Sequence, residues 1–137
     1  MDTVDTGKSA LGLEGNLAAA LGYPIGVIAI ISLVMEKENR FVKFHALQAV
    51  LLYVGWIVLM IAFWIIAIIL TVVGVAASAA TNSGAMGGLF GGLLSLLGLV
   101  IGLAFLIGII LAAVKAYQGQ EFKLPVIGNI AANFANK

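Results

Sequence analysis

The sequence has very little charge and no cysteine. Of its 137 residues, 9% are charged and 63% are hydrophobic, whereas a soluble domain carries about 25% charged residues. So few charges cannot cover a surface that faces water, which excludes a soluble globular protein. The lack of cysteine excludes disulfides, thiolate metal sites and cysteine nucleophiles. The net charge of +1 also argues against nucleic acid as a partner, because binding to phosphates requires clustered basic residues.

Long uncharged runs dominate the chain instead. They cover 17–35, 49–80 and 89–114, and a helix that rises about 1.5 Å per residue needs about 20 residues to cross a bilayer. Because lipid offers the backbone no hydrogen bonds, each run should be helical. The sequence therefore predicts an all-α integral membrane protein with a three-helix transmembrane domain, its spans at about 17–35, 45–75 and 89–114, and a short interfacial helix near the C-terminus.

The second run leaves an alternative open. It is longer than one straight crossing needs, and residues 71–80 are mostly small, so a break there would make four spans. The segment before the first run carries Asp2, Asp5 and Glu14 against Lys8, and thus lacks the basic region of a signal peptide. We therefore expect the first helix to remain in the mature protein.

Basic residues predict the orientation of the chain. Six of them lie between the first two runs or after the third, and one lies before the first run. The six are Lys37, Arg40, Lys43, Lys115, Lys123 and Lys137, and the seventh is Lys8. By the positive-inside rule, residues 1–16 should lie outside the cytoplasm and the tail 116–137 inside it, with the protein in the cell (inner) membrane.

Glycines recur at helical spacing in the third run. Gly88 and Gly92 are four residues apart, as are Gly98 and Gly102. Small residues at this spacing let two helices approach closely in lipid. We expect these glycines to pack against the small-residue end of the second run, with a contact between two copies of the chain as the alternative.

Two polar segments at the ends of the runs hold the candidate interaction residues. In the first segment, Asn39 is a candidate N-cap, and one helix face collects aromatic, imidazole and amide side chains while the opposite face is basic. The second segment lies in the tail. The candidates are Asn39, Arg40, Phe41, Lys43, Phe44, His45, Gln48, Leu124, Pro125 and Gly128.

His45 is the only histidine in the chain. Its functional interpretation is a ligand for a metal, haem or chlorophyll, or a proton relay. Its structural interpretation is a hydrogen bond to a neighbouring helix end or backbone carbonyl. A single histidine cannot complete a site without acidic or thiolate neighbours in the spans, so we favour the structural interpretation and expect no cofactor and no metal.

The tail offers partners to this polar face. Gly119 is predicted to end the third helix, and Pro125 to precede a new short one. His45 and Gln48 need hydrogen-bond partners at a boundary where water is scarce. Because the tail exposes backbone carbonyls on the same predicted side, we expect it to dock on His45 and Gln48.

The two polar segments resemble those of a known family. The motifs are EKENRFVKFHALQA at 36–49 and LPVIGNIA at 124–131. They resemble the Tic-twenty-like family of small bacterial and archaeal membrane proteins, which is described as similar to a chloroplast inner-envelope protein-import component. The resemblance covers residues 21–134 and implies a multi-pass protein of the plasma membrane without an established function.

The runs contain no acidic residue and no lysine, which disfavours catalysis and ion-coupled transport. We therefore expect a non-catalytic scaffold or accessory subunit that lies in the lipid bilayer and packs against other membrane proteins or itself. The alternative, implied by the resemblance, is a component of a protein-translocation or insertion apparatus.

Overall fold

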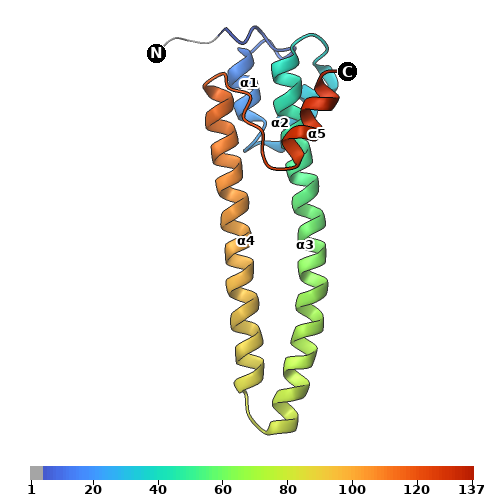
Figure 1. Ribbon diagram of the computed structural model, residues 1–137, viewed down its shortest axis with the longest axis vertical. Helices are drawn as coiled ribbons and strands as arrows, with labels where there is room; N and C mark the ends of the chain where they lie inside the picture. Colours follow the sequence, from blue (N-terminus) through green and yellow to red (C-terminus); the bar gives the residue numbers. More distant parts are fainter. Residues whose placement is uncertain (1–4) are drawn as a thin grey trace. The chain divides into compact units, whose positions relative to one another are not determined.

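The computed structural model describes residues 5–137, and its regular elements are α-helices (Figure 1). This confirms the predicted all-α class. In chain order the helices are α1 (Gly15–Leu21), α2 (Gly26–Met35), α3 (Arg40–Thr81), α4 (Ala85–Tyr117) and α5 (Ile127–Ala135). Of these, α3 and α4 are long and apolar enough to cross a membrane.

The first apolar run is not one helix, contrary to the predicted span at 17–35. Helix α1 ends at Leu21 and α2 begins at Gly26. Pro24 explains the break, because proline cannot donate a backbone hydrogen bond and disfavours helical backbone in the residue before it. With 7 and 10 residues, neither helix reaches the length of a transmembrane helix.

The second run, in contrast, continues without a break from Arg40 to Thr81. The four-span alternative required a break at residues 71–80, and that stretch is helical. Asn82 follows the helix with a φ of 53°, a conformation that asparagine adopts more readily than most residues. Helix α4 ends at Tyr117, and Gly119 has a φ of 75°, as predicted for the residue that stops this helix.

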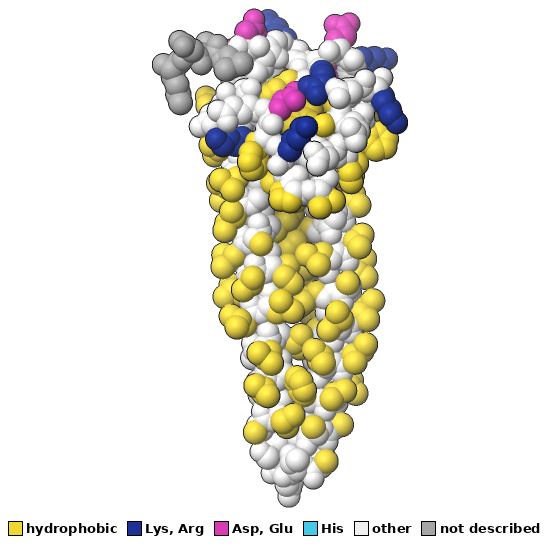
Figure 2. Space-filling view, viewed as in Figure 1, with side chains coloured by type: hydrophobic (Ala, Val, Ile, Leu, Met, Phe, Trp, Pro, Cys, Tyr) yellow, Lys and Arg dark blue, Asp and Glu magenta, His cyan; other side chains and the backbone are white. Residues whose placement is uncertain are grey.

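The chain divides into two compact units. The charged unit comprises the residues up to Gly55 and from Leu106 onward, and the uncharged unit is Trp56–Phe105. The uncharged unit contains no Asp, Glu, Lys, Arg or His, so all seven basic residues belong to the charged unit. Figure 2 shows the charged side chains gathered on that unit, and hydrophobic side chains over the surface of α3 and α4.

Within the uncharged unit, α3 and α4 contact each other through aromatic rings and glycines. Trp56 stacks on Phe105, with ring centroids 4.2 Å apart. Gly98 faces Phe63, so closely that a Cβ on Gly98 would lie 3.3 Å from the ring Cζ. The Phe63 ring therefore fills the space that Gly98 leaves.

Three of the four predicted packing glycines do not point their Cβ positions at α3. A Cβ added to Gly88, Gly92 or Gly102 would meet nothing within 4 Å. Near the α3–α4 loop the close approach is made by Gly87, where a Cβ would lie 3.0 Å from Ser78 Oγ. Glycine spacing identifies a helix face, but the contact depends on how α4 is rotated about its axis.

The core of the charged unit is built from small side chains. Ala19 of α1, Ala29 of α2, Ala49 of α3 and Ala112 of α4 are buried in one cluster, together with Tyr23. Small residues let the helices approach closely, which leaves the larger polar side chains of α3 enclosed between them.

Helix α5 packs beside the beginning of α3. Its residues Ala131, Ala132 and Ala135 form a cluster with Phe44. Gly128, at one end of α5, adjoins Gln48, and Asn136, beyond the other end, accepts a hydrogen bond from Arg40. Helix α5, the short C-terminal helix predicted from the sequence, is therefore antiparallel to the first turns of α3.

The N-terminal segment is joined to the same unit by hydrogen bonds. The Asn39 side-chain amide donates to the carbonyl of Thr6 at 2.7 Å. The Asn16 amide donates to the carbonyl of Tyr117 at 2.9 Å. The described part of this segment therefore adjoins both the start of α3 and the end of α4.

These contacts bring the described residues of the N-terminal segment next to the tail, whereas the sequence predicted the two on opposite sides of the membrane. The break at Pro24 is the physical reason, because α2 runs back alongside α1 and brings the chain to the start of α3. Residues 1–4, which include Asp2, lie outside the described residues.

Candidate functional site

Three polar side chains form a buried network in the charged unit. They are Tyr23, His45 and Gln48, each with 0% of its surface exposed. Helix α3 supplies His45 and Gln48, whose spacing of three residues places them on one helix face, and the α1–α2 turn supplies Tyr23. The connecting segment, residues 118–126 between α4 and α5, provides backbone groups to the same network.

Gln48 uses both donors and the oxygen of its side-chain amide. Its Nε2 donates to the Tyr23 hydroxyl at 2.8 Å and to the carbonyl of Phe122 at 3.0 Å. Its Oε1 accepts the backbone N–H of Leu124 at 3.0 Å. Because these partners differ in kind, they determine which end of the amide is nitrogen. Gln48 thus ties the α1–α2 turn and the connecting segment to α3.

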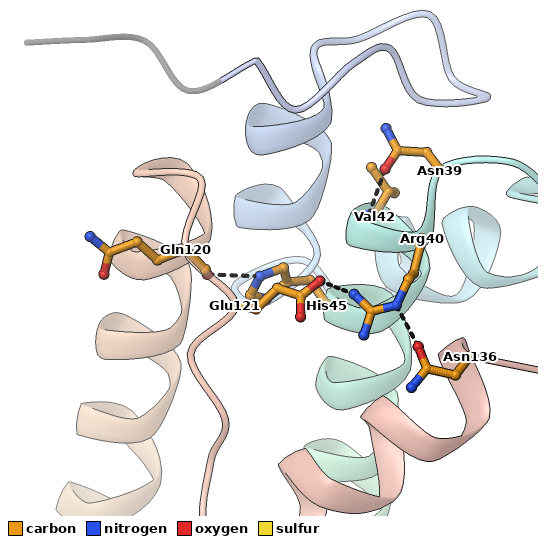
Figure 3. A network of polar contacts seen from close by, with 7 residues as sticks. All are labelled: Asn39, Arg40, Val42, His45, Gln120, Glu121 and Asn136. Carbon is orange, nitrogen blue, oxygen red and sulfur yellow. Dashed lines mark hydrogen bonds and ion pairs between the residues drawn. The ribbon is translucent and has the colours of Figure 1, made fainter.

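His45 is bonded at both ring nitrogens. Its Nε2 lies 3.1 Å from the carbonyl oxygen of Gln120 (Figure 3), and its Nδ1 lies 2.8 Å from the Tyr23 hydroxyl. A carbonyl can only accept, so Nε2 carries the proton. The Tyr23 oxygen accepts from Gln48, which leaves its own proton to be donated to Nδ1. His45 is therefore the neutral Nε2–H tautomer.

The surroundings of this network are apolar. The rings of Phe41 and Phe44 meet the His45 ring edge-on, at centroid distances of 4.6 and 4.9 Å. Burial raises the pKa of the Tyr23 hydroxyl well above its usual value, which keeps this group protonated and able to donate.

Arg40 holds the connecting segment and α5 at the edge of the site (Figure 3). Its guanidinium pairs with the Glu121 carboxylate and donates to the side-chain oxygen of Asn136. The two charged side chains are 45% and 32% exposed, so this ion pair contributes only about 0–1 kcal/mol. We expect these contacts of Arg40 to determine where the connecting segment and α5 dock, more than to stabilise the fold.

The start of α3 is capped as predicted. Asn39 Oδ1 accepts the backbone N–H of Val42 at 3.2 Å (Figure 3), which is the hydrogen bond of an N-cap residue. The buried Glu36 carboxylate accepts the N–H of Asn39 at 3.0 Å and that of Ala10 at 2.7 Å. Glu36 thus connects the cap residue Asn39 to Ala10 of the N-terminal segment.

Most of the predicted interaction residues meet in this site. His45 and Gln48 lie at its centre, and Leu124 and Gly128 adjoin Gln48. The docking of the tail on His45 and Gln48 is present as expected. Lys43 is partly exposed and Pro125 is exposed, and neither side chain takes part in the network.

The sequence interpretation missed Tyr23 and Glu36. Tyr23 lies inside the predicted span 17–35, although Gly22, Pro24 and Gly26 surround it and are residues that favour a turn. Glu36 carried no comparable signal, because its partner Ala10 is distant in sequence and contributes only a backbone N–H.

Chemically, the network holds segments of the chain together. A metal or haem iron at His45 would have to displace either Tyr23 or the Gln120 carbonyl. Within residues 5–137, no three His, Asp or Glu side chains gather in a way that could hold a metal ion. In this network the side-chain polar atoms of Tyr23, His45 and Gln48 each have a defined partner, as in a structural core.

Comparison with known proteins places the chain in a family. The model of the magnetosome magnetite crystal formation protein family (MamF/MmsF) matches residues 9–131. A UPF0132 membrane protein of Methanocaldococcus jannaschii is 39% identical over 130 residues, which is 94% of this chain and 96% of the relative. A UPF0132 membrane protein of Archaeoglobus fulgidus is 37% identical over 124 residues, 87% of this chain and 93% of the relative.

No solved structure matches the chain. The names of these relatives describe membrane proteins and no enzymatic activity. None of them mentions the Tic-twenty-like family, so that finer resemblance stays a prediction. The matched length and the identities show that the chain is a membrane protein that belongs to the UPF0132 and MamF/MmsF family.

Proposed function

We propose that the protein is a non-catalytic scaffold or accessory subunit that packs in the membrane against other membrane proteins or a second copy of itself. The observation that supports this proposal is that Tyr23, His45 and Gln48 are hydrogen-bonded to one another and to the connecting segment. Catalysis needs a group that is free to exchange a proton or to attack a substrate. The buried polar network of the described residues is instead used to hold segments of the chain together.

The glycine face of α4 supports the idea of a packing partner. Gly88, Gly92 and Gly102 have open space where a Cβ would be, and a backbone can approach such positions closely. At 100° per residue, Leu99 lies on the same face, and 59% of its surface is exposed. A neighbouring helix would therefore find both an apolar surface and close access to the backbone.

We also propose two membrane crossings, by α3 and α4, with both ends of the described chain on the cytoplasmic side of the cell membrane. Support comes from the seven basic residues, all in the charged unit, and from the uncharged α3–α4 loop. The positive-inside rule assigns the basic side to the cytoplasm. The hydrogen bonds of Asn16 and Asn39 keep the N-terminal segment on that side as well.

Cysteine labelling tests this topology directly, because the chain has no native cysteine. We expect an impermeant thiol reagent to label Ser83→Cys in intact cells. Ala10→Cys and Asn133→Cys, both at exposed positions, should be labelled only after lysis. Labelling of Ala10→Cys from outside would contradict the two-crossing arrangement.

Photo-crosslinking in native membranes tests the scaffold function. A benzophenone side chain in place of Leu99 should form a discrete adduct with another membrane protein or with a second copy. The matched control is Leu97, which is 48% exposed and lies on nearly the opposite face of α4, where we expect lipid adducts only. Adducts with nascent secretory chains would instead favour the translocation alternative, and an absence of protein adducts at both positions would refute the scaffold.

A further inference from the structure

The α1–α2 hairpin is apolar over its outer surface. Its exposed side chains follow one side of α2 and continue onto the turn. They are Ile25, Val27, Ile30, Ile31, Val34 and Met35, with exposures that reach 74% at Val34. An apolar surface of this kind is costly in water and marks a contact with lipid or protein.

Charge is confined to the base of this hairpin. No charged residue lies between Glu14 and Glu36. At the base, Lys8 and Glu14 are paired through their backbones, and Glu36 accepts the N–H of Ala10. The hairpin therefore changes from a charged base to an apolar turn along its length.

The turn lies beside the apolar part of α3. The Tyr53 hydroxyl donates to the carbonyl of Tyr23, and a Cβ on Gly26 would lie 3.1 Å from the Tyr53 ring. Tyr53 is within the uncharged run that begins at Ala49. Non-helical backbone at membrane depth is tolerated only where the protein satisfies its polar groups, and Tyr53 does this for the carbonyl at the turn.

We propose that α1 and α2 form a half-membrane hairpin whose outer face binds the acyl chains of the cytoplasmic leaflet. The 10 residues of α2 span about 15 Å, which is half of a hydrocarbon core of about 30 Å. Acyl chains are the occupant because the exposed face continues the apolar surface of α3 at Tyr53 and bears no charge. This inference goes beyond the scaffold function and rests on the two-crossing topology.

Spin-label accessibility provides the test. Single cysteines at Ile25, Ile30 and Lys37 would be spin-labelled in the full chain, reconstituted in vesicles of phosphatidylcholine and phosphatidylglycerol. All three side chains are exposed, so labelling should leave the packing intact. We expect collisions with oxygen to exceed those with a nickel chelate at Ile25 and, to a smaller degree, at Ile30, and the reverse at Lys37. A label at Ile68 of α3, 61% exposed, provides the reference for a deep position.

The other outcomes of the spin-label experiment would contradict the proposed hairpin in different ways. Nickel access at Ile25 equal to that at Lys37 would show that the hairpin lies in water. Immobile labels that neither reagent reaches would show that protein covers this face. Both results overturn the hairpin while leaving the scaffold function open, whereas external labelling of Ala10→Cys overturns the topology beneath it.

Discussion

A Gln48→Leu substitution should lower the free energy of unfolding by about 3 kcal/mol or more. Leucine nearly preserves the volume of the side chain but removes the hydrogen bonds to Tyr23, Phe122 and Leu124. The carbonyl of Phe122 and the N–H of Leu124 then lose their partner inside the protein, and each orphaned group costs about 1–3 kcal/mol. We expect the connecting segment to detach from α3 in this variant.

The matched control is Gln118→Leu, which makes the same chemical change at an exposed position of the connecting segment. Exposed substitutions of this kind usually change stability by less than about 0.5 kcal/mol. Unfolding in mixed micelles, followed by circular dichroism, would measure both variants. Similar small losses in the two would mean that the Gln48 network does not hold the charged unit together.

A Gly128→Ala substitution should destabilise the charged unit by about 2–3 kcal/mol. Its Cβ would lie 2.6 Å from the Lys123 Cβ, 2.7 Å from the Lys123 Cα and 2.7 Å from Gln48 Oε1. Two of these atoms belong to the backbone or its first side-chain carbon, so they cannot rotate away, and overpacking of this kind typically costs about 1–3 kcal/mol. Relief requires the start of α5 to move away from Lys123 of the connecting segment and from Gln48 of α3.

Gly88→Ala is the control for this substitution. Gly88 lies in α4, where an added Cβ would meet nothing within 4 Å, and alanine favours a helix over glycine by up to about 1 kcal/mol. We therefore expect the melting temperature in detergent to be unchanged or slightly raised. Limited proteolysis of Gly128→Ala should in addition cleave the connecting segment faster than in the wild type. Equal stability of the two variants would refute the close packing of Gly128 against Lys123 and Gln48.

The polar site was largely predictable from the sequence, because the side chains that require hydrogen-bond partners lie close to one another in the sequence. His45 and Gln48 share a helix face at the edge of an apolar run, and such groups require partners. Gly119 stops α4 shortly before the carbonyls of Gln120 and Phe122, which supply those partners. The residue types and their spacing thus indicated both sides of the contact.

The fold of residues 5–39 was not predicted, because hydrophobicity alone does not distinguish a spanning helix from a short hairpin. The run 17–35 is long enough for one crossing, and the local signs of a turn are limited to Pro24 and the glycines Gly22 and Gly26. The partners of the N-terminal segment depend on tertiary contacts, such as Asn39 with Thr6. Glycine spacing likewise could not determine that Gly98, rather than Gly102, faces Phe63.

We infer that the buried network is a structural lock with fixed proton positions. Nitrogen NMR of protein labelled only at histidine tests it most directly, since His45 is the single histidine. We predict one set of signals from a neutral ring, with Nε2 protonated and Nδ1 accepting from Tyr23. A Tyr23→Phe variant should shift the Nδ1 signal and leave Nε2 bonded to the Gln120 carbonyl. A doubly protonated ring, the opposite tautomer or an exchanging mixture of the two would contradict the structural lock.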